Sequence, residues 1–599
     1  MDRNSAIGLT LIAVLLLLYF NFFSPTPSPS PTKPAEVTTT DLGKADTLSS
    51  KPDTSHRDSL QARQYGNLSS FLKGDEVLTT VETKDLIVTF SNQATIRQVE
   101  LRNFKTYSQK PLYLVSAKTN SFSLSAQNEG KEIDLYHLFY SVQSTKSKDT
   151  TVVSFVAKIG EGVYLKHTYS IPSEGFKIRY TIESSGLDGM LTGTGFTLNW
   201  IDHIPLQEKD ISDSRSKTTV NYYLAKGQFD GLSESSSKTE TDVLAEPVKW
   251  VAIKQKFFLS SLIAGRVFTG GEVTVSTNPL DSGTVKTAWV KVFIPKSDVS
   301  SRQAKFDYYF GPNDYDLVGK VTDGFSRNLY LGWPPVLYVN RYLIIPIFKF
   351  LERFITNYGI IIVLLVFFIK LLLSPLSYSS YVGMAKMKLL KPELDALKEK
   401  NGDNVAQNQQ DQLKLYQQAG VNPFSGCIPL LLQMPFLFSM FYFFPNSIWL
   451  RQQHFLWSED LSTYDSVLNL PFTIPFYGDH VSLFVLLMTA STLIYTWQNN
   501  QISSVQGPMK SMSYFMPVIF MFVLNKFSAG LSFYYFVSNL FTFAQQAIIR
   551  RFVDDTKIKA IMDENKKKAV TGNGKKSNFM ARLEQAMKAN EETKRKTKG

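Results

Sequence analysis

The second half of this chain alternates apolar runs with polar loops, and one run carries a lysine in its interior. Residues 359–373 contain a single charge, Lys370. A lysine near the centre of a membrane helix costs about 2.5–3.5 kcal/mol on insertion scales. About six apolar neighbours at roughly −0.5 kcal/mol each offset that cost. The run therefore predicts a membrane span with a buried ionisable side chain, and such side chains usually face a cavity, a partner or a transport path.

Six spans are predicted in total. The five core spans are expected at residues 358–376, 427–444, 481–497, 514–527 and 531–549. A sixth apolar run, residues 7–23, is about long enough to cross a bilayer. No small-residue cleavage site follows it, which favours an uncleaved N-terminal anchor (residues 1–23) over a signal peptide. Basic residues after Pro375, around Lys510 and at Arg550–Arg551 favour cytoplasmic loops, with the N-terminus in the cytoplasm.

A large β domain is predicted between the anchor and the core. Residues 24–62 are rich in Pro, Ser and Thr and are expected to be a linker. Residues 63–325 hold short alternating apolar runs separated by Gly, Ser, Asn and Asp, which is typical of antiparallel strands. Trp200 and Trp250 are expected in its core. By the orientation above, this domain lies opposite the cytoplasm, which in a bacterium is the periplasm.

Two helical elements flank the first core span. In residues 326–357, apolar residues recur at helical spacing from Tyr342 to Phe354 with charged residues between them, which predicts an interfacial amphipathic helix. Residues 378–424, within the 358–549 core, predict a cytoplasmic coiled-coil hairpin with a turn at 401–404 and a stop at Gly420. Pro392 is expected to kink the first arm or open its second half.

Lys370 has three interpretations on physical grounds. Its stem is long enough to reach the end of the run, so snorkelling is one. A Ser–Lys hydrolase using Ser374 is another, but an i,i+4 pair near a helix end is a common coincidence. The third is a wet cavity, which polar residues of other spans favour: Gln433, Thr489, Ser491, Thr492, Thr496, Asn539, Thr542, Gln545 and Gln546.

Motifs for catalysis or cofactor binding were not found in the sequence. There is no phosphate-binding loop, no nucleophile elbow and no metal motif. The six histidines lack metal-ligand spacing, and the single cysteine, Cys427, excludes an intrachain disulfide. We therefore expect no enzyme activity, no metal and no cofactor.

Several ordered motifs resemble the YidC/Oxa family of membrane insertases. They are the segments at 367–376, 385–387, 421–429 with 433–435, 515–520 and 534–540, and in the β domain 250–258 and 310–312. The resemblance covers nearly the whole chain except the linker and tail. It implies insertion and folding of inner-membrane proteins, alone or with the Sec translocon, and a periplasmic β-supersandwich fold.

The resemblance also implies a site. The family has a hydrophilic groove, open to cytoplasm and lipid, in which one positive charge attracts acidic residues of a nascent membrane protein. Lys370 holds that position, where the family commonly has arginine. The charge is kept, but bidentate pairing with a carboxylate is lost. Gln433, Tyr534 and Tyr535 are the other expected substrate-contacting residues.

The tail, residues 550–599, is basic and has two interpretations. It carries 15 Lys+Arg against 7 Asp+Glu. A solvated segment that binds anionic lipid is one, and docking to the RNA of the ribosome is the other. A secondary transporter with a midplane site is the alternative function for the whole chain, but the sequence shows no internal repeat and one intramembrane charge.

Overall fold

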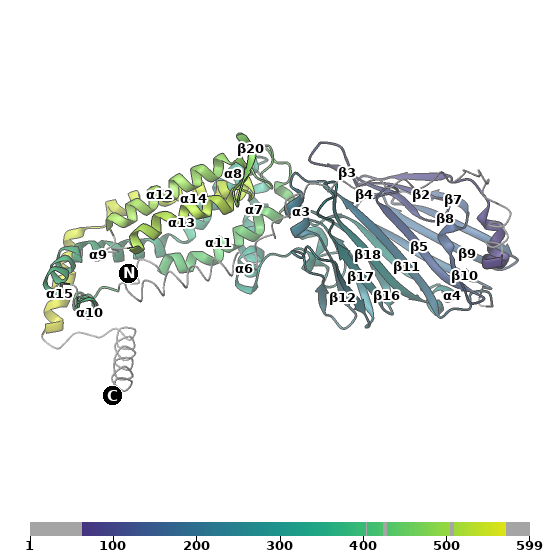
Figure 1. The fold of residues 1–599 in the computed structure, drawn as a ribbon, viewed down its shortest axis with the longest axis horizontal. Helices are drawn as coiled ribbons and strands as arrows, with labels where there is room; N and C mark the ends of the chain where they lie inside the picture. Colours follow the sequence, from purple (N-terminus) through teal and green to yellow (C-terminus); the bar gives the residue numbers. More distant parts are fainter. Residues whose placement is uncertain (1–62, 188, 403, 423–427, 503–507, 571–599) are drawn as a thin grey trace, which may run out of the picture. The chain divides into compact units, whose positions relative to one another are not determined.

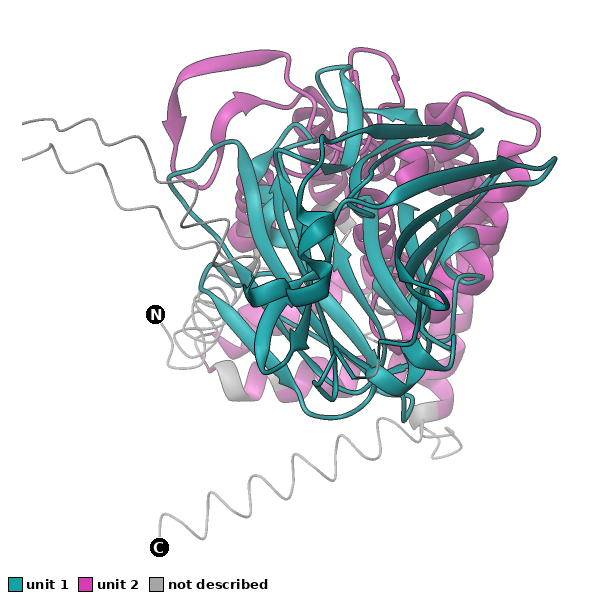
Figure 2. Ribbon diagram, turned by 90° about the vertical axis from the view of Figure 1, so that its right-hand side faces the viewer, with its two compact units in different colours: residues 1–330 teal, residues 331–599 magenta. Residues whose placement is uncertain are grey.

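The computed structural model describes residues 63–187, 189–402, 404–422, 428–502 and 508–570 (Figure 1). The predicted anchor and linker lie outside these residues. The chain divides into two compact units, residues 1–330 and 331–599 (Figure 2). The first unit is rich in strands and the second in helices.

The β-rich unit contains three antiparallel sheets within its described residues. Their strand orders are β1-β2-β3-β4, β13-β12-β15-β16-β19-β10-β9-β8-β7 and β14-β17-β18-β11-β5-β6. The strands are β1 Leu78–Glu82, β2 Leu86–Ser91, β3 Ile96–Lys105, β4 Pro111–Ser116, β5 Asn120–Asn128, β6 Lys131–Asp134, β7 Ser141–Lys146, β8 Thr150–Gly160, β9 Val163–Pro172, β10 Lys177–Ser185, β11 Gly195–Pro205, β12 Thr219–Leu224, β13 Phe229–Gly231, β14 Glu240–Leu244, β15 Val248–Lys254, β16 Phe258–Phe268, β17 Gly271–Ser276, β18 Thr284–Pro295 and β19 Lys305–Pro312. Short helices join some of them: η1 Gly66–Leu72, η2 Leu135–His137, α3 Ile211–Lys217, α4 Lys296–Ser300, α5 Tyr315–Val318 and η3 Phe325–Asn328.

Aromatic side chains hold the large sheets together. Strand β11 alternates half-buried and buried residues, as one face of a sheet packed on a core requires. Its Trp200 contacts Tyr308 and Phe310 of β19, in the nine-stranded sheet, at ring separations of 6.5 and 6.0 Å. Trp200 and Trp250 are both buried. The predicted antiparallel β domain and the core positions of both tryptophans are confirmed.

The helix-rich unit contains a helix in each of the five predicted core ranges. Its elements are α6 Pro334–Val339, η4 Asn340–Ile344, α7 Ile345–Glu352, α8 Tyr358–Leu372, α9 Ser374–Asn401, α10 Val405–Ala419, α11 Ile428–Asn446, η5 Ile448–Leu450, β20 Leu468–Ile474, β21 Gly478–Val481, α12 Leu483–Ile502, α13 Pro508–Leu524, α14 Ala529–Phe552 and α15 Asp555–Val570. By length and composition, no described helix qualifies alone as a membrane span, whereas α8 and α9, joined at a 62° bend, qualify as a pair. The number of spans remains a prediction.

Two predicted helix boundaries were wrong. The helix expected from Tyr342 begins at Pro334, because prolines are well tolerated in the first turn, where the missing N–H has no partner to lose. The first hairpin arm begins at Ser374 rather than Tyr378, directly after the bend at the end of α8. Helix α9 also continues through Pro392, so the arm is not opened there. The predicted turn after Asn401 and the stop at Gly420, which adopts φ 64°, are confirmed.

The basic tail contains a helix, α15, that was not predicted from the sequence. Helix α15 packs against both arms of the hairpin, with Ile558 and Met562 buried in one cluster with Leu390, Leu394 and Tyr416. Lys566 forms an ion pair with Glu393 of α9. The interpretation of the tail as a solvated segment is therefore wrong for α15. Its two buried residues are spaced by four positions, which places them on one helix face.

Candidate functional site

Lys370 lies in the last turn of α8, and its side chain is directed to α14. The Nζ atom donates a hydrogen bond to Oγ1 of Thr542 at 2.9 Å. Ile362, Val366 and Ile369 of the same helix are buried, whereas Phe367 and Phe368 are exposed. Lys370 is half-buried and lies four residues after Val366, on the side of α8 that faces the other helices. The hydrogen bond across to α14 argues against a side chain that only snorkels along its own helix.

Helix α14 supplies a row of polar side chains beside Lys370. Asn539, Thr542 and Gln545 are spaced by three residues, so each lies beside the next on the helix surface. Gln545 donates through Nε2 to the carbonyl of Lys370 at 3.4 Å, which is one of the carbonyls left unpaired at the end of a helix. Thr542 also donates to the carbonyl of Ser538 at 2.8 Å. The ammonium therefore has neutral neighbours on α14.

The same polar row reaches α12 one turn away. Asn539 donates through Nδ2 to the hydroxyls of Ser491 and Thr492, both at 2.9 Å. Each hydroxyl in turn donates to the carbonyl of Met488. These bonds join α12 to α14, which is the common role of such residues between membrane helices. The structure thus brings together five of the polar residues predicted to surround a cavity, and they make specific contacts.

The remaining predicted site residues lie elsewhere in the unit. Tyr534 is buried, with its ring 5.7 Å from Phe444 and 5.5 Å from Tyr535. Thr542 follows Tyr534 by eight residues in α14, a rise of about 12 Å along the helix. Gln433 is half-buried in α11 and makes no hydrogen bond to Lys370 within the described chain. Lys370, Gln433, Tyr534 and Tyr535 therefore do not form one cluster.

A second polar group lies where α12 begins; we call it the polar seal (Asp465, His480, Ser482 and Asn525). All four residues are buried. The carboxylate of Asp465 accepts hydrogen bonds from the backbone N–H groups of Leu483 and Phe484, at 2.9 and 3.1 Å, and from the hydroxyl of Ser482. Asp465 therefore caps the positive end of α12.

Asn525 completes the polar seal between α13 and α14. Its Oδ1 accepts from the N–H of Ser482 at 3.0 Å, and its Nδ2 donates to the carbonyls of Tyr477 and His480 at 3.1 and 2.7 Å. Nε2 of His480 lies 2.8 Å from the carbonyl of Asn525. This group was not predicted from the sequence. A usable signal was Ser482 directly before an apolar run, which is a helix N-terminus pattern.

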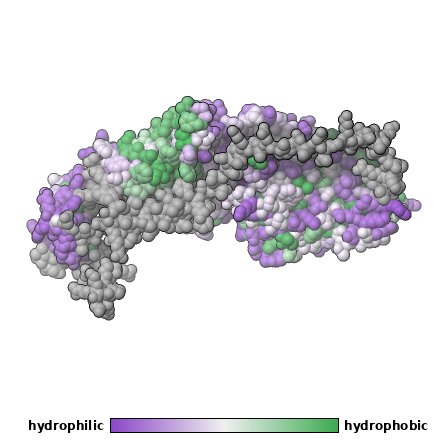
Figure 3. Space-filling model, viewed as in Figure 1, coloured by the Kyte–Doolittle hydropathy of each residue, from purple (hydrophilic) through white to green (hydrophobic). Residues whose placement is uncertain are grey.

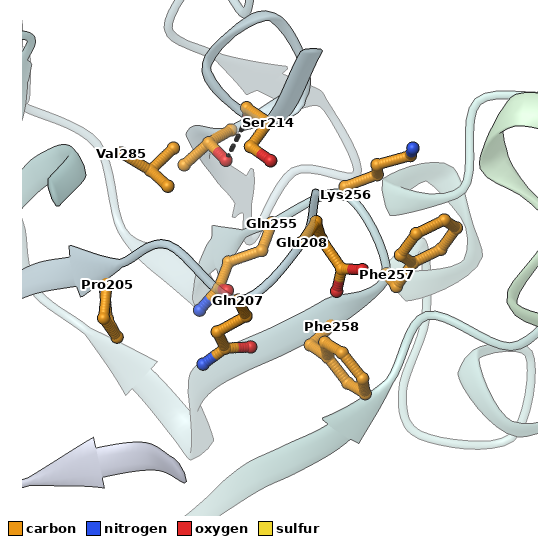
Figure 4. Close-up of a pocket in the computed structure, with 10 residues that line it drawn as sticks. Pro205, Gln207, Glu208, Ser214, Gln255, Lys256, Phe257, Phe258 and Val285 are labelled. Carbon is orange, nitrogen blue, oxygen red and sulfur yellow. Dashed lines mark hydrogen bonds between the residues drawn. The ribbon is translucent and has the colours of Figure 1, made fainter. Parts of the chain in front are cut away.

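The β-rich unit holds a small polar cavity, shown in Figure 4. Oε1 of Gln207 and Nε2 of Gln255 are buried there without a hydrogen-bond partner in the described chain. The cavity has room for about one water molecule, which accounts for both amide groups better than a ligand would. Within the described residues, no three His, Cys, Asp or Glu side chains are placed to hold a metal ion.

Two protein families match consecutive parts of the chain. The family described as "YidC periplasmic domain" matches residues 78–345, which include all strands from β1 to β19. The family described as "60Kd inner membrane protein" matches residues 350–557, from α7 to the start of α15.

Similar proteins extend over the full length. A "Membrane protein insertase YidC" of Amoebophilus asiaticus is 44% identical, covering 98% of this chain and 99% of the relative. Another, from Cytophaga hutchinsonii, is also 44% identical and covers 99% and 98%. The solved structure of an active YidC insertase with its first transmembrane domain covers 82% of this chain and 99% of that chain, at 19% identity and a TM-score of 0.31.

Proposed function

This chain belongs to the YidC/Oxa family of membrane protein insertases, and on that premise we propose that Lys370 receives acidic residues of the inserting substrate. The chain is a bacterial membrane protein with a large β-sheet periplasmic domain and a C-terminal helical insertase region. Its function is membrane protein insertion rather than chemical catalysis, and the alternative of a secondary transporter is set aside. The residues and the route of the substrate are our proposal.

One observation carries the assignment of Lys370. Its ammonium contacts a neutral hydroxyl, that of Thr542, and forms no ion pair with a carboxylate of the described chain. A half-buried cation without a counter-charge attracts an incoming carboxylate, because the surroundings screen it less than water does. The ammonium has three donors, so an aspartate or glutamate can bind while the contact with Thr542 is kept or exchanged.

The polar row on α14 supports a wet groove beside Lys370. Asn539, Thr542 and Gln545 offer hydrogen-bonding groups in a row along α14 that runs from α12 to α8. Water held there shortens the hydrocarbon path, so a short polar segment crosses at lower cost while the following apolar segment enters lipid. We assign Gln433, Tyr534 and Tyr535 to contacts with the apolar part of the substrate, and the polar seal to the closed end of the groove.

The topology that we propose has six spans. Residues 1–23 form the anchor, with its N-terminus in the cytoplasm, and residues 24–62 the linker. Residues 63–325 form a periplasmic β-supersandwich, which three antiparallel sheets support. Residues 326–357 form the interfacial helix, residues 358–549 the five-span core with the cytoplasmic hairpin at 378–424, and residues 550–599 the basic tail.

The proposed partners follow from this topology. The substrates are nascent membrane proteins, because the chain belongs to a family of membrane protein insertases. We propose that the Sec translocon cooperates with this chain for larger substrates, and that the basic tail contacts the ribosome or anionic lipids. The charge of the tail supports both contacts, since each partner is polyanionic.

Insertion assays with Lys370 variants test the proposal. In reconstituted vesicles, Lys370→Met and Lys370→Ala should lower insertion of a small substrate with an acidic tail by about tenfold, which corresponds to about 1.4 kcal/mol. Lys370→Arg should keep most activity because the charge remains. Lys388→Met, which removes an exposed lysine of α9, is the matched control and should have no effect.

A change in the substrate completes this test. Replacing the aspartates in the tail of the substrate by asparagine should make insertion by the wild type and by Lys370→Met more nearly equal. Without these carboxylates, the substrate has no charge to pair with Lys370 in the wild type. Equal insertion of the acidic substrate by wild type, Lys370→Met and Lys370→Ala would contradict the role of the charge.

A further inference from the structure

An apolar hairpin lies in the connection between α11 and α12. It comprises β20 and β21, and residues 466–478 contain no charged side chain. Leu468, Phe472 and Phe476 are 57%, 60% and 66% exposed. A cluster of large apolar side chains exposed to this extent marks an interaction surface.

The turn of the apolar hairpin, residues 475–477, is held against the helices, although Phe472 and Phe476 are exposed. Tyr477 is buried, with its ring 5.4 Å from Phe522 of α13. Its carbonyl and that of His480 accept hydrogen bonds from Asn525 of the polar seal. The helices therefore hold the turn, and with it Phe476, in a defined place, and Phe472 precedes this turn by three residues.

The backbone of the apolar hairpin is unsuited to pairing with a further strand. Pro471 lies within β20 and Pro475 directly after it, and neither has an N–H to donate. The pairing of β20 with β21 is also irregular between Asn469 and Ile474. An extended protein segment would meet an interrupted row of donors, and residues 466–478 offer it no charge to pair with; the nearest charge in the hairpin is the exposed Asp479 of β21. These features favour a lipid surface over a protein strand.

The apolar hairpin adjoins the apolar surface of the helices. Helix α12 begins at Leu483, two residues after β21 ends, and Leu486 in its first turn is exposed. Leu456 and Trp457, in the same connection, are exposed as well. Figure 3 shows that apolar side chains gather on the helix-rich unit in the region where Figure 1 labels α12 and β20. Apolar surface is thus continuous from α12 to the connection before it.

We propose that the apolar hairpin lies in the interface of the outer leaflet, with Leu468, Phe472 and Phe476 among the lipid acyl chains. The proposal rests on the proposed function in one respect, the placement of the α11–α12 connection on the periplasmic side. Because residues 466–478 are uncharged, the contact depends on apolar burial, and neither salt nor the fraction of anionic lipid should change it.

Spin labels measure the depth of the apolar hairpin. After Cys427→Ser, a nitroxide is attached at Phe472→Cys or at Leu468→Cys in the full chain, reconstituted in vesicles. We expect dissolved oxygen to reach these labels more readily than a water-soluble nickel chelate does. Val243→Cys, an apolar residue of β14 that is 75% exposed, is the matched control and should show the reverse order. At both positions, the relative access of oxygen and of the chelate should not change with salt or with the fraction of anionic lipid.

Three results would overturn the proposal. One is chelate access at residue 472 equal to that at residue 243. Another is a depth that depends on anionic lipid. The third is a photocrosslinker at Phe472 that captures a stalled substrate instead of lipid, which would assign the apolar hairpin to substrate binding. Insertion by the labelled protein, measured in the same vesicles, separates these outcomes from a failure of the proposed function.

Discussion

At the scale of single residues, Lys370 differs from an arginine in what its charge can do. The ammonium is a compact charge on a flexible stem, and one of its three donors is used by Thr542. An arginine would present a planar fork that suits one carboxylate in one orientation. The lysine accepts a carboxylate from several directions but holds it less specifically. We therefore infer that this position suits substrates whose acidic residues vary in place.

Burial in the β-rich unit favours the uncharged form of Asp202, a residue of β11. The side chain is buried, and neither carboxyl oxygen has a hydrogen-bond partner in the described chain. Burial raises the pKa of Asp202 to about 8. Asn120, which lies opposite Asp202 on β5, lowers the same pKa by a smaller amount. The folded unit therefore keeps a proton that the unfolded chain releases near pH 4. Stability should fall as pH rises from about 4 to 8, by up to about 1.4 kcal/mol per pH unit.

Asp202→Asn should remove this pH dependence. The amide has the shape of the protonated acid and cannot ionise, so the variant should be more stable than the wild type by several kcal/mol at pH 8 and about equal to it near pH 4. Pulse proteolysis of the full chain in urea, following the fragment from the β-rich unit, measures the difference. Asp230→Asn, at an exposed strand position, is the control. A difference that does not depend on pH would contradict the assignment.

At the scale of elements, α15 determines how freely the hairpin can move. The second arm of the hairpin has few apolar residues, so a hairpin of these two helices alone would open readily. In the structure, α15 adds a third helix. Its residues Ile558 and Met562 pack against the apolar side chains between α9 and α10. Lys566 adds an ion pair with Glu393, which contributes little at the surface. Opening of the hairpin therefore requires α15 to separate from it.

Met562→Ala should loosen the hairpin, and Ile561→Ala should not. Met562 is 2% exposed and its neighbour Ile561 is 51% exposed, so the two changes differ in burial. Truncating a buried methionine costs about 2 kcal/mol or more, which makes local opening about thirtyfold more frequent. Hydrogen exchange of residues 385–421, measured by mass spectrometry, reports the opening. Equal exchange in the two variants would show that α15 does not hold the hairpin.

Sequence periodicity predicted the elements that bury one continuous face, and it missed those that depend on distant partners. The strand pattern of the β-rich unit and the five core helices were predictable because each buries its own apolar side chains. Helix α15 was not predictable, because its two apolar residues, which lie among lysines, become buried only when they pack against the hairpin. Thr542 was recognised as polar, but its pairing with Lys370 joins residues 172 positions apart, which no local pattern reveals.

At the scale of the whole molecule, the formal charge of +12 is concentrated at one end of the chain. Residues 571–599 carry eight Lys+Arg and three Asp+Glu, so they contribute +5. Helix α15 precedes this stretch and packs on the hairpin. A deletion of the complete tail would therefore disturb the hairpin together with the charge, and a test of the tail must leave α15 in place.

Removal of residues 571–599 should weaken binding to ribosomes and reduce its salt dependence. For each phosphate that the shortened tail no longer neutralises, the slope of log K against log salt should become shallower by about 0.7 to 0.9. Co-sedimentation with ribosomes across a salt series measures this, and flotation with anionic vesicles measures the lipid contact separately. Replacing Lys594, Arg595 and Lys596 by glutamine in the full chain is the matched variant. Unchanged co-sedimentation at physiological salt would reject ribosome docking.

The polar seal bears on how the cell maintains its membrane potential. A membrane potential of 100 mV is worth about 2.3 kcal/mol for each elementary charge that crosses. A water-filled passage through the whole bilayer would let protons and ions dissipate it. In the proposed groove, water ends at Asp465, Ser482 and Asn525, whose donors and acceptors are already bonded to one another and to helix ends. A groove of the proposed kind would let the cell keep a wet path for proteins in an energised membrane without discharging it.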